Sequence, residues 1–220
     1  YFTWGDELLS EEQYEKKLGT LKYPFLSEGI KVPSPDETIE TLESGKPYPI
    51  KAAWIQTNNP IACMAADSKR TYEAIKKLDF VVVVDLFMTP TAMAFADIVL
   101  PAATGPERNG IRAFWYYLGS INKATQIGEC KSDMEINLLL GKRLNPEAWP
   151  WNTVEEMFTD MIKPAKITFE ELQNNVQMFP KFAYKKYEKG MTNPKHELGF
   201  NTPTGKVELY STIMEKAGLD

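Results

Sequence analysis

The sequence predicts an α/β fold in which a parallel sheet is flanked by helices. Three apolar stretches have the length of strands: residues 50–56, 80–84 and 98–100. The first two are separated by a segment with helical spacing of its apolar residues, and the last two by room for a short helix. Strands that alternate with helices over short connections are typical of parallel sheets with right-handed crossovers. We therefore expect a Rossmann-like layer over about residues 50–102.

The elements of this layer follow from local patterns. Residues 50–56 have the composition of a strand, and the turn-forming residues 57–60 end it. Residues 67–78 carry apolar side chains at the spacing of one helical face. The run 80–84 is continuous and mostly β-branched, which is typical of a strand buried on both faces. Residues 89–96 can form a short helix that leads into the third strand.

The segment before this layer is predicted to combine short helices with irregular chain. Ser10 stands at a capping position before a polar helical pattern that ends at Gly19. A second short helix is expected over residues 36–42, and Gly45 ends it.

The segment after the layer is predicted to be irregular at first and helical later. Residues 111–127 are aromatic and irregular. A capping-box pattern begins a helix over residues 132–144, and Thr153 and Thr168 each precede a further helix with acidic residues in its first turn. The pattern of residues 198–211 predicts a β-hairpin.

Length and patterns together predict three parts. A chain of 220 residues has room for about one and a half domains. We expect an N-terminal helical and irregular segment (residues 1–46), a Rossmann-like domain (residues 47–145), to which the resemblance described below assigns cofactor binding, and a helical extension that ends in a hairpin (residues 146–220).

Composition excludes several classes of function. The chain has 25 Lys and Arg against 30 Asp and Glu, a net charge of −5 without a basic stripe, so nucleic acid is a poor candidate partner. Its longest strongly apolar run, residues 80–84, is far too short for a membrane span. Cys63 and Cys130 are too far apart for a zinc or iron–sulfur motif, and His196 has no nucleophile elbow near it. We therefore predict no catalytic residue and no metal ligand within this chain.

The candidate binding residues follow the strands, because ligands of open parallel sheets bind at the carboxyl ends of the strands. Asn58, Asn59 and Pro60 follow the first strand, and Asp85 and Thr89 follow the second. These five positions are therefore expected at one edge of the sheet.

Two interpretations of the second loop remain open from the residues alone. A carboxylate at Asp85 can accept two parallel hydrogen bonds from the N1–H and N2–H₂ edge of guanine, or bind ribose hydroxyls. Thr89 stands where the free N–H groups of a helix start favour a phosphate. The alternative is that Asp85 and Thr89 only cap this helix. A third loop, residues 104–110, can close over the same edge, and the absence of Gly-x-Gly-x-x-Gly disfavours the usual NAD site.

Three segments of the chain are similar to a known family of enzymes. They are KPYPIKAAWIQTNNP, LDFVVVVDLFMTPTAMAFADIVLPAAT and GFNTPTGKVELYS. They resemble the dimethyl sulfoxide reductase superfamily, the molybdenum and tungsten oxidoreductases that use bis-(molybdopterin guanine dinucleotide). The resemblance extends over residues 47–110 and returns at residues 199–211.

The resemblance implies an internal fragment, roughly a third of a parent enzyme. The parent is expected to carry bis-(molybdopterin guanine dinucleotide) with molybdenum or tungsten, whereas the fragment alone is expected to lack the cofactor and to be inactive. Family members catalyse two-electron redox or oxygen-atom transfer, and some catalyse non-redox hydration. They often hold an iron–sulfur cluster in an N-terminal part outside this region. The implied partners are the remaining domains of the parent and, in some members, an electron-transfer subunit.

The resemblance also implies roles for individual residues. Asp85 would hold the guanine of one cofactor, and Thr89 would bind its ribose or a nearby phosphate. The turn at Asn58, Asn59 and Pro60 would lie beside the diphosphate or the pterin. The family's Glu-x-x-Gly element is matched by three further candidate residues: Glu107, Asn109 and Gly110.

Some positions depart from the family pattern or have a structural explanation. Thr57 stands where the family often has glycine, which restricts close approach of the backbone. Residues 114–121 lack the family's Thr-Asn-x-Glu-Gly-Arg pattern, so no role is assigned there. Asp97 is expected to stabilise the start of a strand. The competing function is a non-catalytic Rossmann-like module that binds a purine nucleotide or a protein, with Asp85 and Thr89 as helix caps.

Overall fold

The computed structural model describes most of the chain in two compact units. One unit comprises residues 50–180, and the other comprises residues 1–49 and 181–220. The predicted boundaries near residues 46 and 145 remain predictions. The described residues are all except 1–8, 20–21, 23–32, 65–66, 115–116, 180–183, 190–198, 201, 203, 217 and 219–220.

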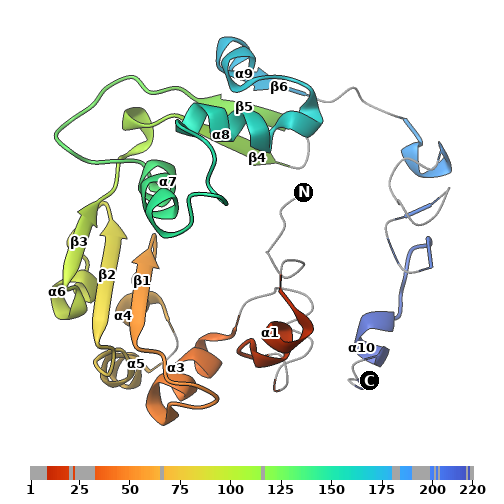
Figure 1. Cartoon of the computed structure of the whole chain (residues 1–220). Coiled ribbons are helices and arrows are strands. Elements are labelled where there is room, and N and C mark those ends of the chain that lie inside the picture. The colour runs from red at the N-terminus through yellow and green to blue at the C-terminus, as the bar shows by residue number, and fades with distance from the viewer. Residues whose placement is uncertain are drawn as a thin grey trace. The chain divides into compact units, whose positions relative to one another are not determined.

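The first part of the 50–180 unit is a three-stranded parallel sheet in the order β1-β2-β3 (Figure 1). Helices precede or follow each strand along the chain, which confirms the predicted α/β layer. The bounds are β1 (Ala52–Gln56), α4 (Pro60–Cys63), α5 (Ser68–Ile75), β2 (Phe80–Asp85), α6 (Pro90–Phe95) and β3 (Ile98–Pro101).

The central strand β2 is buried as its composition predicts. The four valines of residues 81–84 are each at most 7% exposed, and Val81 and Val83 pack with Ala92 of α6. Asp97 accepts a 2.7 Å hydrogen bond from the backbone N–H of Val81, in agreement with its expected role at the start of a strand. Burial of β-branched side chains on both faces fixes the register of this sheet.

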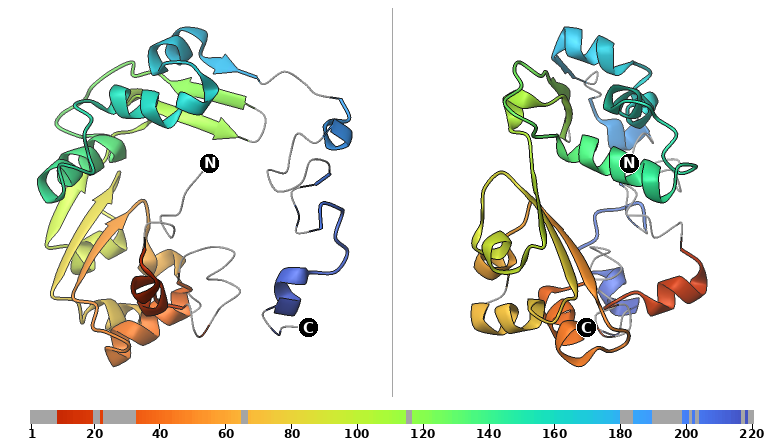
Figure 2. Two further views of the ribbon diagram at one scale, coloured as in Figure 1. Left: turned by 45° about the vertical axis from the view of Figure 1, so that its right-hand side comes forward. Right: turned by 60° about the vertical axis from the view of Figure 1, so that its left-hand side comes forward.

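The helices of the second part begin where their caps predict. Ser132 and Glu135 form a capping box, and Thr153 and Thr168 each accept a backbone N–H with their side chain. Together with the antiparallel sheet these helices enclose a second core (Figures 1 and 2). The bounds are α7 (Asp133–Leu144), α8 (Val154–Met161), η3 (Lys163–Ala165) and α9 (Phe169–Asn175).

The antiparallel sheet corrects the prediction that residues 111–127 are irregular. Strands β4 (Gly110–Phe114) and β5 (Tyr117–Ile121) pair with each other, and β6 (Gln177–Met178) pairs with β5. Ile111 and Leu118 pack against the second core, whereas Phe114 is 57% exposed. The outward positions are therefore partly aromatic, and this hides the alternation of apolar and polar residues by which a strand is recognised. The prediction holds for residues 122–127, which form no helix or strand.

The other unit contains the two predicted N-terminal helices, but the predicted hairpin is only partly present. Gly205 donates a 3.1 Å hydrogen bond to Thr202 and so closes the turn, yet residues 204–211 contain no strand. Val207 is 63% and Leu209 100% exposed, so no sheet buries this arm. Residues 198, 201 and 203 of the hairpin lie outside the described residues. The helices in the described part of this unit are α1 (Glu11–Lys16), α3 (Pro35–Ser44), the short 3₁₀ helix η4 (Lys186–Lys189) and α10 (Thr212–Lys216).

Among the described residues, no helix has both the length and the apolar character that crossing a bilayer requires.

Candidate functional site

A cavity of about 490 Å³ opens at the carboxyl edge of the parallel sheet. The strands end there, at the arrowheads in Figure 1, and α7 begins beside them. This is the edge where the sequence places its candidate residues. The lining comprises Thr57, Asn58, Asn59, Cys63, Val84, Asp85, Leu86, Phe87, Ala102, Ala103, Thr104, Gly105, Arg108 and Asp133.

Asp85 presents a partly used carboxylate to this cavity. It is the half-buried last residue of β2, and its Oδ1 accepts hydrogen bonds from the N–H groups of Leu86 (2.7 Å) and Phe87 (3.3 Å). These bonds fix the side chain against its own loop. Among the described residues, none donates a hydrogen bond to Oδ2.

Thr89 caps the helix instead of lining the cavity. Its side chain accepts a 3.2 Å hydrogen bond from the N–H of Ala92 at the start of α6. Asp85 makes no such bond to α6. The capping interpretation therefore describes Thr89 and is wrong for Asp85.

The loop after β1 is held by Thr91, which lies in the first turn of α6. Thr91, at 0% exposure, donates a 2.7 Å hydrogen bond to Oδ1 of Asn59 and accepts one of 3.2 Å from the N–H of Ile61. Pro60 is buried in the first turn of α4, and Asn58 is exposed at the cavity. Thr91 thus ties this loop to α6, a contact over 32 positions that no local pattern indicates.

Thr57 adopts the left-handed backbone conformation that glycine favours. Its φ is 57°, and its N–H donates a 3.2 Å hydrogen bond to the carbonyl of Val84. A β-branched residue in this region is strained, because its Cβ crowds the backbone. Threonine at this position therefore keeps the left-handed loop conformation, but it lowers the free energy of unfolding relative to glycine.

Glu107 is buried and surrounded by hydrogen-bond donors. Its Oε2 accepts from the N–H and hydroxyl of Thr104 (3.0 and 2.7 Å), and its Oε1 accepts from the N–H of Ile127 (3.1 Å) and the thiol of Cys130 (3.3 Å). The bonds from Thr104, and then that from Cys130, lower the pKa of Glu107 from 4.5 to about 2. Desolvation and this carboxylate raise the pKa of the Cys130 thiol. Glu107 lies outside the cavity lining and shapes the third loop.

Asn109 and Gly110 also act from outside the cavity. The side-chain amide of Asn109 donates a 2.7 Å hydrogen bond to Glu155, and its side-chain oxygen Oδ1 accepts one of 2.9 Å from the N–H of Lys123. Gly110 begins β4, and a Cβ there would lie 2.9 Å from Nη1 of Arg108. Glycine at this position therefore leaves room for the guanidinium of Arg108.

Two charged residues of the lining were missed by the sequence analysis. Arg108 is half-buried and supplies the positive charge of the described lining. Asp133, the first residue of α7, accepts a 2.7 Å hydrogen bond from Nε2 of Gln56. Arg108 lies within the third candidate loop, so its charge was a usable signal, whereas Asp133 is brought in by the tertiary fold.

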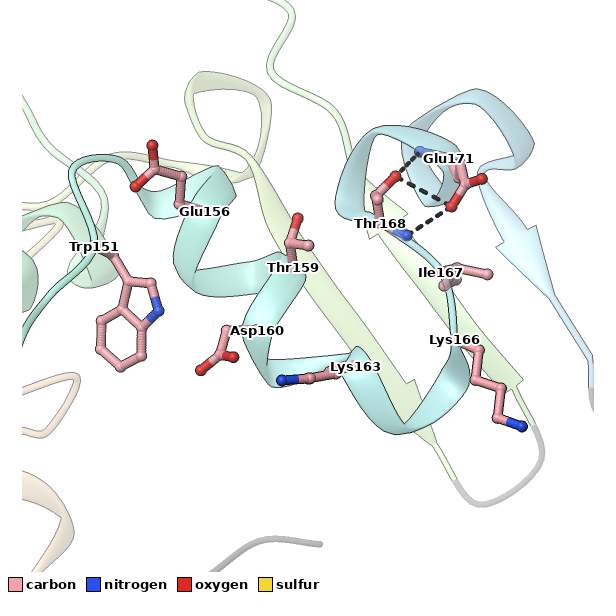
Figure 3. A pocket seen from close by; sticks show the side chains of 9 residues that line it. All are labelled: Trp151, Glu156, Thr159, Asp160, Lys163, Lys166, Ile167, Thr168 and Glu171. Atoms are coloured by element: carbon pink, nitrogen blue, oxygen red, sulfur yellow. Dashed lines mark hydrogen bonds between the residues drawn. The ribbon is translucent and has the colours of Figure 1, made fainter.

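A second cavity, of about 530 Å³, lies along α8, η3 and α9 (Figure 3). In this cavity Glu171 accepts hydrogen bonds from the N–H and the hydroxyl of Thr168. Glu156 accepts a 2.7 Å hydrogen bond from the N–H of Asn152. Figure 3 shows Lys166 directed away from Asp160. Glu171 belongs to the capping box of α9, and Glu156 is engaged by the backbone ahead of α8, so the carboxylates of this second cavity do not share one ligand position and the edge cavity is the better candidate. The described His, Cys, Asp and Glu residues form no group of three that could hold a metal.

Comparison with known proteins identifies a family that the chain matches. The family model "Molybdopterin oxidoreductase" matches residues 12–142. The chain is 30% identical to acetylene hydratase of Syntrophotalea acetylenica over 97% of its own length and 32% of that protein. It is 32% identical to trimethylamine-N-oxide reductase of Haemophilus influenzae, over 77% of this chain and 23% of that enzyme.

A solved structure supports the same assignment. Acetylene hydratase from Pelobacter acetylenicus superimposes with a TM-score of 0.80 at 28% identity, and the match covers 97% of this chain and 32% of that one. The chain thus spans about a third of the length of these hydratases. The family model covers more than half of the chain. The chain belongs to the molybdopterin oxidoreductase family.

Proposed function

We propose that the edge cavity binds the guanosine dinucleotide part of molybdopterin guanine dinucleotide, within a molybdenum or tungsten enzyme. The carboxylate of Asp85 is the observation that carries this proposal. It stands at the cavity with Oδ1 fixed by two backbone N–H groups and Oδ2 without a donor from the described residues. A carboxylate offers about four acceptor sites, so capacity remains for the N1–H and N2–H₂ edge of guanine.

The rest of the lining fits the same ligand. Arg108 offers a guanidinium for the diphosphate, and the carboxylate of Asp133 can accept from sugar hydroxyls. The amides of Asn58 and Asn59 lie at the end of the neighbouring strand. A volume of about 490 Å³ is within the range of small-molecule sites. This donor set suits a nucleotide better than an apolar ligand.

The chain's residues would bind and orient the cofactor, and the bound group would supply the two-electron redox or oxygen-atom transfer chemistry. The remaining domains of a longer protein would complete the site. An electron-transfer subunit would be a further partner, since one relative of this chain is named as the alpha subunit of an F420-dependent formate dehydrogenase. A hydratase among the relatives makes non-redox hydration the second reaction class.

The binding proposal is tested by NMR titration of the chain with guanosine diphosphate, which detects millimolar affinities. The loops at residues 57–60 and 85–89 should shift, and Asp85→Asn should weaken binding about tenfold because a charge-assisted pair is lost. Asp79→Asn, at the opposite end of β2, is the matched control. Equal affinities for guanosine diphosphate and adenosine diphosphate, or an unchanged affinity in Asp85→Asn, would contradict the proposal.

The cofactor itself is tested on the whole protein that contains this chain. Metal analysis and the fluorescence of oxidised pterin should both be positive in material from the native source. Guanine-nucleotide binding by a native protein with neither metal nor pterin would favour the non-catalytic nucleotide-binding module instead.

A further inference from the structure

A chain of two hydrogen bonds leads from an exposed indole to the cavity. Nε1 of Trp54 donates to Oε1 of Gln56 at 2.9 Å, and Nε2 of Gln56 donates to Oδ1 of Asp133 at 2.7 Å. Trp54 and Gln56 are two positions apart on β1, so their side chains lie on the same face of the strand. The second bond joins the carboxyl end of β1 to the first residue of α7, 77 positions later.

The indole determines which way the Gln56 amide points. An indole N–H can only donate a hydrogen bond, so the atom that faces Trp54 must be the carbonyl oxygen Oε1. Nε2 is then turned toward Asp133, which as an ionised carboxylate can only accept. Without the indole N–H, Oε1 of Gln56 would lose its donor, and the bond to the carboxylate alone would hold the amide. Trp54 therefore acts on Asp133 through Gln56.

The result is a carboxylate with one oxygen fixed and one available. Oδ1 of Asp133 is used by Gln56, and Oδ2 has no donor among the described residues. Asp133 lines the same cavity as Asp85. Asp85 also has one oxygen fixed, in its case by two backbone N–H groups. A preorganised acceptor binds a ligand more tightly, because less side-chain freedom is lost on binding.

We propose that Trp54 and Gln56 are positioning residues, which orient the carboxylate of Asp133 toward the ligand in the edge cavity. This inference rests on the proposed function, since it takes guanosine diphosphate as the probe of that cavity. Neither residue contacts the ligand; both act through Asp133.

The test is a double-mutant cycle read by NMR titration of the full chain with guanosine diphosphate. Gln56→Leu and Asp133→Asn should each weaken binding about tenfold, and the double variant should bind no more weakly than Asp133→Asn alone. Trp54→Phe keeps the aromatic ring but removes the donor, and should weaken binding about threefold. Gln173→Leu is the matched control, because Gln173 bonds Asn109 away from the cavity, and it should leave the affinity unchanged.

A spectroscopic readout separates positioning from a merely structural role. In the unsubstituted chain the side-chain amide resonance of Gln56 should shift when guanosine diphosphate binds, because the charge of its acceptor is then shared with the ligand. The shift should disappear in Asp133→Asn. A fall in melting temperature of Gln56→Leu with unchanged affinity would overturn the inference.

The two proposals fail in different ways. If Asp85→Asn weakens binding while Gln56→Leu and Trp54→Phe do not, the proposed function stands and the positioning role is overturned. Additive losses in the cycle would overturn it as well. If the unsubstituted chain does not respond to guanosine diphosphate, both proposals fall together.

Discussion

Glu107 is a buried carboxylate that lies behind the cavity wall and not in its lining. Four donors from Thr104, Ile127 and Cys130 surround it, so its ionised form is strongly favoured and its pKa falls to about 2. These bonds join residue 104 to residues 127–130 and so fix the third loop from behind. The residue matched to the family by pattern thus stabilises the wall that carries Arg108.

The lowered pKa of Glu107 makes its contribution dependent on pH. A carboxylate whose pKa is lower in the folded chain stabilises the fold above its ordinary pKa of 4.5, and this contribution is lost as the pH falls toward about 2. Glu107→Gln should therefore be less stable than the unsubstituted chain at neutral pH, and should lose less stability on acidification. Urea midpoints between about pH 7 and pH 3 measure both effects. The exposed Glu129 provides the control Glu129→Gln, and parallel pH profiles for all three proteins would refute the assignment.

The strain at Thr57 predicts a stabilising substitution. A left-handed conformation costs a residue with a Cβ about 1–2 kcal/mol, and glycine costs about 0.5–1 kcal/mol through its freedom in the unfolded chain. Thr57→Gly should therefore raise the free energy of unfolding by about 0.5–1 kcal/mol, as measured by urea denaturation. Thr57→Ala keeps the Cβ and should gain less. Equal gains for glycine and alanine would show that φ of 57° is not the cause.

At the scale of elements, the sequence patterns succeed where a pattern is local. Strands β1 to β3 and the starts of α7, α8 and α9 were predicted, because burial periodicity and caps act within a few residues. Strands β4 and β5 were missed, because only part of each contacts the core and Phe114 faces outward. The prediction of a second hairpin strand was wrong although the pattern was present. Val207 and Leu209 alternate with polar residues as in a strand, but both side chains are exposed and are not packed against a sheet.

The link between α4 and α6 depends on one hydroxyl. Thr91→Val conserves shape but leaves Oδ1 of Asn59 and the N–H of Ile61 without their partner, at a cost of about 1–3 kcal/mol. Thr91→Ser keeps the hydroxyl and loses only a methyl group, about 0.8 kcal/mol. Urea denaturation should therefore rank serine above valine. The reverse order would mean that packing, not hydrogen bonding, holds this loop.

At the scale of the whole molecule, the place of the site was predictable but its full composition was not. Asp85, Asn58 and Asn59 meet at the cavity because parallel strands end at a common edge. Asp133 reaches the same cavity from a helix that begins 77 positions after Gln56, and only the tertiary fold brings it there. Glu107, Asn109 and Gly110 match a sequence element of the family, yet all three lie outside the cavity lining: Glu107 and Asn109 hydrogen-bond to neighbouring loops, and Gly110 leaves room for Arg108. The sequence pattern therefore predicts three residues of the cavity lining, whereas the contacts of the other five candidate residues come only from the structure.

The division into two units predicts that residues 50–180 fold without the rest of the chain. Both hydrophobic clusters of this unit, one around Val83 and one around Phe169, consist of its own residues. Its two sheets likewise contain only its own strands. A chain of residues 50–180 should therefore unfold cooperatively, with a urea midpoint close to that of the same transition in the full chain.

Phe169→Ala, which removes a ring that is 1% exposed, should lower the midpoint equally in both proteins, since the cavity it creates costs about 3–5 kcal/mol wherever the same core surrounds it. A shortened chain without a cooperative transition, or a Phe169→Ala effect confined to the full chain, would mean that residues 1–49 or 181–220 are required for this core.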